Sequence, residues 1–128
     1  MMTATLTDST IVTQSKFFVS NFNTAIIDGP LRIYFAEEQE ALALKLYFRI
    51  QELFERDGTS LQNWPEAESS VFCMVYPTEE IFQSIFEAPQ ETNFHLDRLG
   101  KDFVFGLTGA TDDQQALRIY SHMRGLVG

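Results

Sequence analysis

Residues 16–36 show the pattern of two strands on either side of the turn dipeptide Asp28-Gly29. This dipeptide tolerates the positive φ angles that hairpin turns need, so the stretch predicts two antiparallel strands. Pro30 has no N–H with which to close a two-residue loop, which predicts a longer connection with Ile26 opposite Leu31. That register makes one face of the hairpin a core face and leaves the other face mixed. The expected core face carries Phe22, Thr24, Ile26, Leu31, Ile33 and Phe35.

A second hairpin is predicted over residues 93–107, with its turn near Leu99-Gly100. Between the two hairpins, the unbroken apolar run of residues 71–76 has the length of a strand, and it predicts a central strand buried on both faces. The period of two places five apolar side chains of the second hairpin on one face: Phe94, Leu96, Phe103, Phe105 and Leu107.

Residues 37–56 predict the longest helix, because acidic residues open it and Gly58 follows its end. Its apolar arc spans about 240° at 100° per residue, whereas a helix that covers one sheet needs an arc of about 100°. The surplus edge lies at Leu44 and Phe48. It indicates either a second covering layer or contact with a partner.

Two shorter helices are predicted beyond the apolar run. The first follows Pro77 with Thr78 as its N-cap, and it ends before Pro89. The second opens at a capping box formed by Thr111 and Gln114. Its expected inward residues are Ala116, Ile119, Tyr120 and Met123.

The order of these elements predicts an α+β domain with a mainly antiparallel sheet of about five strands, in the order ββαβαββα, covered by three helices in two or three layers. Residues 1–15 are rich in Thr and Ser and are expected to form a flexible N-terminal segment, with at most an edge strand at residues 10–13. Residues 16–128 are expected to form a single domain. Each half carries a strand, turn, strand, helix unit, which fits either an internal duplication or two units that meet the same packing demands.

Composition narrows the class of protein. The chain has 128 residues with 45% hydrophobic residues, 12 Phe and one Cys. This length and hydrophobicity suffice for a core without a metal, and one Cys excludes both a disulfide framework and a four-Cys zinc site. We find no basic, apolar leader at the N-terminus and no run long enough to span a membrane. A cytoplasmic location is therefore expected, with Cys73 as a small buried hydrophobe.

The net charge of −9 comes from 18 acidic and 9 basic side chains, and it is concentrated in residues 57–97, the acidic central segment. A negative balance argues against a nucleic-acid partner and against binding to an anionic membrane, because both need clustered Lys and Arg. The segment contains Trp64 and no Lys or Arg. It indicates either simple solubility or a docking surface for a basic protein partner. Its eight acids are Asp57, Glu66, Glu68, Glu79, Glu80, Glu87, Glu91 and Asp97.

Motifs for chemistry are scarce. The string from Phe103 to Thr111 carries Gly106 and Gly109 ahead of a helix, as a phosphate cradle would, but the third glycine of a dinucleotide fingerprint is missing. His95 and Asp97 are two apart on a predicted strand and point the same way, yet no further ligand completes a metal site. We therefore assign no catalytic residue, no metal and no cofactor. His122 is expected on the polar face of the last helix.

The leading expectation is a non-catalytic intracellular interaction or regulatory domain of unspecified role. Its predicted contacts are a basic protein partner at the acidic central segment, with Trp64 as the anchor, and a second copy of the chain at Leu44 and Phe48. The alternative is a small-molecule sensor or carrier with an aromatic pocket, which requires a cavity with convergent polar groups such as Thr24, Tyr34 or His95. A third possibility is an enzyme that uses His95 and Asp97 as a pair, which requires a cleft around them.

Overall fold

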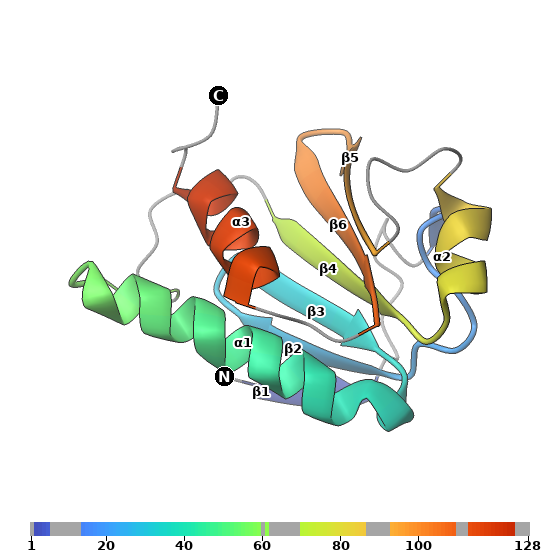
Figure 1. Ribbon diagram of the computed structural model, residues 1–128, viewed down its shortest axis with the longest axis horizontal. Helices are drawn as coiled ribbons and strands as arrows, with labels where there is room; N and C mark the ends of the chain where they lie inside the picture. Colours follow the sequence, from blue (N-terminus) through green and yellow to red (C-terminus); the bar gives the residue numbers. More distant parts are fainter. Residues whose placement is uncertain are drawn as a thin grey trace.

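The computed structural model describes residues 2–5, 14–59, 61, 70–86, 93–109 and 113–124 (Figure 1). These residues form one six-stranded sheet and three α-helices. The strands are β1 (Met2–Thr5), β2 (Thr24–Asp28), β3 (Leu31–Phe35), β4 (Val71–Tyr76), β5 (Phe94–Leu99) and β6 (Asp102–Thr108). The helices are α1 (Glu40–Arg56), which follows a 3₁₀ turn at Glu37–Gln39, α2 (Glu79–Ile85) and α3 (Asp113–Met123).

The sheet is mixed, with the strand order β1-β2-β3-β4-β6-β5. The three outer pairings are antiparallel, whereas β4 lies parallel to both β3 and β6. The α+β class with three helices is confirmed, but the expectation of a mainly antiparallel sheet holds only for the outer pairings. For β3 and β4 the physical reason is the connection through α1, because a helical crossover returns the chain to the end of the sheet where β3 begins. β6 lies parallel to β4 because the chain runs back along β5 and then reverses again in the second hairpin.

The register of β2 against β3 differs from the predicted one. Ile26 lies opposite Ile33, so the expectation that it lies opposite Leu31 is wrong by two residues. Pro30 lies inside the turn beside Gly29, whose φ is 57°, and this position needs no N–H for the ladder. Because side chains alternate with period two, a shift of two residues leaves Ile26 and Ile33 on one face.

Two cores cover the two faces of the sheet. The first core lies between the sheet and the pair α1 and α3, which lie side by side in Figure 1. The second core lies on the opposite face, under α2 and residues 14–23. The domain therefore has three layers, and the strand β4 is buried on both faces as its apolar run predicts. Aromatic side chains of the second core are Phe17, Phe22, Tyr34, Phe72, Tyr76, Phe82 and Phe86.

The second core corrects two expectations about the first hairpin. Phe22 was expected to share a face with Ile26, but it precedes β2 and packs in the second core. The face that carries Ala25 and Tyr34 was expected to be mixed, but both side chains are buried. The alternation could not show this, because the layer that covers this face comes partly from residues 14–23, which lack a strand or α-helix pattern.

The helices and the second hairpin follow their sequence signals. Thr78 caps α2, and its Oγ1 accepts a hydrogen bond from the backbone N–H of Ile81 at 3.1 Å. The four predicted inward residues of α3 are buried, whereas Thr111 lies outside the described residues. The five apolar residues of the second hairpin gather at the first core, as predicted. In the described ranges, no helix is long and apolar enough to cross a membrane.

At the N-terminal edge of the sheet, β1 pairs antiparallel with β2. The candidate edge strand at residues 10–13 lies outside the described part of the chain. The other edge of the sheet is β5, which pairs only with β6 among the described strands. This edge forms one wall of a cleft.

Candidate functional site

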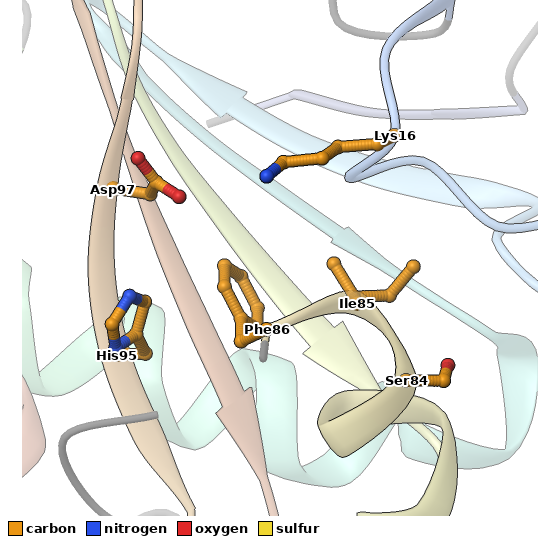
Figure 2. A pocket seen from close by; sticks show the side chains of 6 residues that line it. All are labelled: Lys16, Ser84, Ile85, Phe86, His95 and Asp97. Atoms are coloured by element: carbon orange, nitrogen blue, oxygen red, sulfur yellow. The ribbon is translucent and has the colours of Figure 1, made fainter. Parts of the chain in front are cut away.

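A cleft of about 460 Å³ lies between β5, the C-terminal end of α2 and the turn that follows Gln14, and we call it the β5 cleft. Figure 2 shows its side chains, which come from three segments far apart in the sequence. They combine a cation, a carboxylate, an imidazole and a hydroxyl with two apolar groups. The lining residues are Lys16, Ser84, Ile85, Phe86, His95 and Asp97.

The β5 wall carries His95 and Asp97, both half-buried. They are two residues apart on the strand, so they point to the same face, as the sequence predicts. The backbone N–H of Thr108 donates to the carbonyl of Asn93, so the alternating ladder turns the N–H of Arg98 away from β6. Oδ1 of Asp97 accepts a hydrogen bond from this outward N–H at 2.8 Å. The carboxylate therefore has a fixed place at the edge of the sheet.

Phe86 forms the floor of the cleft. Its ring lies 4.9 Å from the His95 ring, centre to centre, and it is 3% exposed. Beneath it lies Gly106 of β6, the residue directly opposite His95 in the ladder. A Cβ at Gly106 would overlap Cε2 of Phe86 and lie 2.6 Å from Cζ. The ring can reach the sheet only because this strand residue has no side chain.

This contact accounts for one glycine of the phosphate-cradle string. Gly106 is an interior residue of β6, paired with Met74 on one side and with His95 on the other, so it is not part of a loop. Gly109 follows the strand with a φ of 75°, and residues 110–112 lie outside the described part. A glycine inside a strand is a known mark of close approach by another group, and this signal could have drawn attention to Gly106.

The third wall is the turn that carries Lys16, and the second core holds it in place. Tyr76 donates a hydrogen bond from Oη to the carbonyl oxygen of Phe17 at 2.7 Å. The Phe17 ring lies 5.7 Å from that of Phe86, and Nζ of Lys16 lies 5.3 Å from the centre of the Phe17 ring. Figure 2 shows the Lys16 amine pointing across the cleft toward Asp97.

Opposite charges therefore face each other across the cleft without touching. The ion pairs within the described residues both involve Arg49, and none joins Lys16 to Asp97. Lys16 is exposed and Asp97 is half-buried, so both are accessible to a ligand. A polar molecule in the cleft would meet a cation on one side and an anion on the other.

Two nucleophilic side chains of the described residues, Cys73 and Ser84, are poorly placed for chemistry. Cys73 is buried with 0% exposure, and burial raises the pKa of its thiol, so it stays protonated. The expectation that Cys73 is a buried core residue is confirmed. The Ser84 hydroxyl lines the cleft but donates its proton to the carbonyl oxygen of Ile81 at 2.7 Å.

Of the predicted partner-binding residues, the structure describes Leu44 and Phe48, which lie one turn apart on α1. Phe48 lies on α1 with 51% of its surface exposed, whereas Leu44 is partly buried and packs against the first core. Trp64 lies outside the described residues. Leu117 on α3 is 49% exposed, and the sequence reasoning did not single it out. Of the surplus apolar edge predicted for the long helix, Phe48 is therefore the part most exposed to solvent.

The structure describes only part of the acidic central segment. Asp57, Glu79 and Glu80 are exposed, and Asp97 lines the β5 cleft. The remaining acids lie outside the described residues: Glu66, Glu68, Glu87 and Glu91. Whether the segment forms one continuous surface stays a prediction.

The polar groups named for a carrier pocket are dispersed. Thr24 lines a separate hollow of about 290 Å³ beside Glu37 and Glu40, and Tyr34 is buried in the second core. Of the three, His95 reaches the β5 cleft.

His122 departs from its expected place on a polar face. Its ring packs at 4.3 Å from the Phe103 ring and 5.6 Å from the Phe105 ring, centre to centre. Burial, with a smaller contribution from Arg98, lowers the pKa of His122 below its ordinary value. The imidazole therefore packs against the aromatic side chains of β6.

Comparison of the chain with models of protein families, with curated proteins and with solved structures finds no match.

Proposed function

We propose that this protein is a non-catalytic domain that binds a small polar molecule in the β5 cleft, as a sensor or carrier. The observation that carries the proposal is the convergence of Lys16, His95 and Asp97 around one cleft. Its volume of about 460 Å³ falls within the range typical of ligand pockets, roughly 300–1,000 Å³. Side chains from three separate segments supply the polar groups, as in binding sites where a few polar groups orient the ligand.

The hydrogen bonds support binding rather than acid–base chemistry. An acid–base pair needs a carboxylate free to orient the imidazole. Oδ1 of Asp97 instead accepts a hydrogen bond from the backbone N–H of Arg98. The His95 ring rests on Phe86, which limits its rotation. These contacts support fixed charges that recognise a ligand.

A titration followed by NMR tests this proposal. The full chain is titrated with a panel of glycine, succinate, glucose 6-phosphate and putrescine, each to millimolar concentration. We expect at least one compound to shift the signals of Lys16, His95 and Asp97 saturably. Asp97→Asn should weaken that binding, whereas Asp57→Asn, the same charge change at an exposed residue after α1, should not. If no compound shifts the cleft signals, the proposal is wrong.

A second candidate function is protein interaction, and the exposure of Phe48 favours it. We propose self-association through the outer face of α1, together with a basic protein partner at the acidic central segment with Trp64 as its anchor. Sedimentation equilibrium tests the first contact. Phe48→Asp should abolish any dimer, and the variant should stay folded because Phe48 is exposed. A chain that is monomeric at every concentration contradicts self-association. Direct binding to a basic protein, compared between the wild type and Trp64→Ala, tests the second contact.

A cytoplasmic location belongs to the same proposal. The support is the free thiol of Cys73, a small buried group that is compatible with a reducing compartment. Localisation of a tagged full-length chain tests it.

A further inference from the structure

We propose that the ligand of the β5 cleft is a small zwitterion, a free α-amino acid with an uncharged side chain. Lys16 would hold its carboxylate and Asp97 its ammonium group. This inference rests on the proposed function, because it names the ligand class for the same cleft.

The charges in the cleft carry the argument. Lys16 and Asp97 stand on opposite walls, and no ion pair joins them within the described residues. A purely anionic ligand that reaches Lys16 would also meet the Asp97 carboxylate, and a purely cationic ligand would meet the Lys16 ammonium. A molecule with both charges satisfies both walls at once. The α-amino acid is the smallest common metabolite of that kind.

The anionic wall is held in place before any ligand arrives. Oδ1 of Asp97 is bound to the N–H of Arg98 at 2.8 Å, so the carboxylate is oriented by the strand backbone. A carboxylate that is already oriented loses little conformational entropy on binding. An ammonium group is a suitable partner, because it offers three donors to a carboxylate with remaining acceptor positions.

The cationic wall is anchored at its base and free at its tip. The carbonyl of Phe17, next to Lys16, accepts a hydrogen bond from buried Tyr76. The Lys16 side chain itself is exposed. The flexible side chain lets the ammonium follow ligands of slightly different length, whereas Asp97 fixes the other end.

The remaining groups of the cleft indicate what kind of side chain fits. Ile85 is half-buried and His95 presents its ring beside Phe86, so the surface between the charged walls is partly apolar. An uncharged side chain can lie on this surface without competing for Lys16 or Asp97. An amino acid with a second carboxylate would place that charge close to Asp97.

The test uses alanine and two derivatives, each of which lacks one of its two charges. Alanine carries both charges, N-acetylalanine lacks the ammonium, and alanine methyl ester lacks the carboxylate. NMR titration of the full chain should show alanine binding about tenfold more tightly than either derivative, with shifts at the cleft residues. Asp97→Asn keeps an oxygen that can accept the Arg98 N–H, so this variant should remain folded.

The variants connect each charge of the probe with one wall. In Asp97→Asn, alanine and N-acetylalanine should bind with the same affinity. In Lys16→Gln, alanine and its methyl ester should bind with the same affinity. If each variant instead weakens all three probes equally, Lys16 and Asp97 do not recognise the separate charges and the inference is wrong.

The outcomes separate the inference from the proposed function. If alanine binds no better than its derivatives while succinate, glucose 6-phosphate or putrescine occupies the cleft, the assignment of a zwitterion as the ligand is wrong. The ligand-binding function then still stands. If none of the probes shifts the cleft residues, both are wrong. If alanine binds but shifts only residues outside the cleft, the site assignment is wrong.

Discussion

Phe86 and Gly106 are a matched pair in which the ring of one occupies the space that a side chain of the other would fill. Phe86 belongs to the end of α2 and Gly106 to the interior of β6. The ring also touches Phe17, Tyr76, Phe82 and His95. The second core and the floor of the β5 cleft therefore depend on the same close approach.

We predict that Gly106→Ala destabilises the protein by about 1–3 kcal/mol, the usual cost of overpacking a core. The gain that Gly→Ala brings by restricting the unfolded chain is smaller, about 0.4–1 kcal/mol. Urea denaturation of the two proteins measures the difference.

A compensating variant serves as the control for this prediction. Phe86→Leu is smaller at the point of overlap, so it should cost less stability in the Gly106→Ala background than in the wild type. If the two substitutions are additive, their costs are independent and the proposed contact is wrong.

Much of the fold could be predicted because local patterns determine it. The apolar run of β4 predicts a strand buried on both faces, and alternation correctly groups Phe94 and Leu96 on the face of the first core. Neighbours that are distant in the sequence could not be predicted in this way. The parallel pairing of β4 with β3 and β6 depends on how the crossover packs, and periodicity contains no information about it.

In the candidate site, too, the sequence predicts the local arrangement but not the contacts between distant segments. The sequence places His95 and Asp97 on one side of a strand, since a spacing of two decides this. It does not show that Lys16 lies across from Asp97, because the turn that carries Lys16 is held by the bond between Tyr76 and Phe17. That bond joins elements far apart in the sequence, and no short motif marks it.

The raised pKa of Tyr76 predicts that the protein loses folding stability at alkaline pH. Burial raises its pKa above the ordinary value of 10.0, so the folded protein keeps a proton that the unfolded chain releases. The stability due to this group is fully present below pH 10, and it falls as the pH rises above 10 toward the raised pKa. Each such group contributes a slope of up to about 1.4 kcal/mol per pH unit.

Comparison of the wild type with Tyr76→Phe tests this prediction. The variant should lose about 1 kcal/mol near neutral pH, because the bond to the Phe17 carbonyl is gone. Its stability should then fall less steeply above pH 10. Urea denaturation between pH 7.5 and 11 provides both values, and parallel curves would count against the role given to Tyr76.

His122 predicts a loss of stability in weak acid. Burial and the charge of Arg98 lower its pKa from the ordinary value of 6.5, so the unfolded chain takes up a proton before the folded protein does. Stability due to this group is present above pH 6.5 and is lost as the pH falls through the lowered pKa. An NMR titration of the imidazole signals should show His122 protonating below pH 6.5.

Two arginine variants separate the causes of this shift. Arg98→Gln removes the neighbouring charge and should raise the pKa of His122. Arg56→Gln makes the same change in net charge at an exposed arginine at the end of α1, so it should leave the pKa of His122 nearly unchanged. Equal effects of the two variants would mean that the net charge, and not Arg98, is responsible.

The hydrogen bond from Tyr47 to Asp28 connects α1 to the end of β2. It predicts that loss of the Tyr47 hydroxyl oxygen lowers the stability of the protein strongly. Oη of Tyr47 lies 2.5 Å from Oδ2 of Asp28, which is only 6% exposed. Oδ1 of Asp28 is buried and has no hydrogen-bond partner among the described residues. Tyr47→Phe therefore leaves a buried carboxylate without its donor, at an expected cost of about 1.5–3 kcal/mol.

Asp28→Asn lowers the desolvation cost of the acceptor, so Tyr47→Phe should cost less in that background. Urea denaturation of the four proteins measures the coupling, and a coupling near zero would show that Tyr47 does not stabilise Asp28.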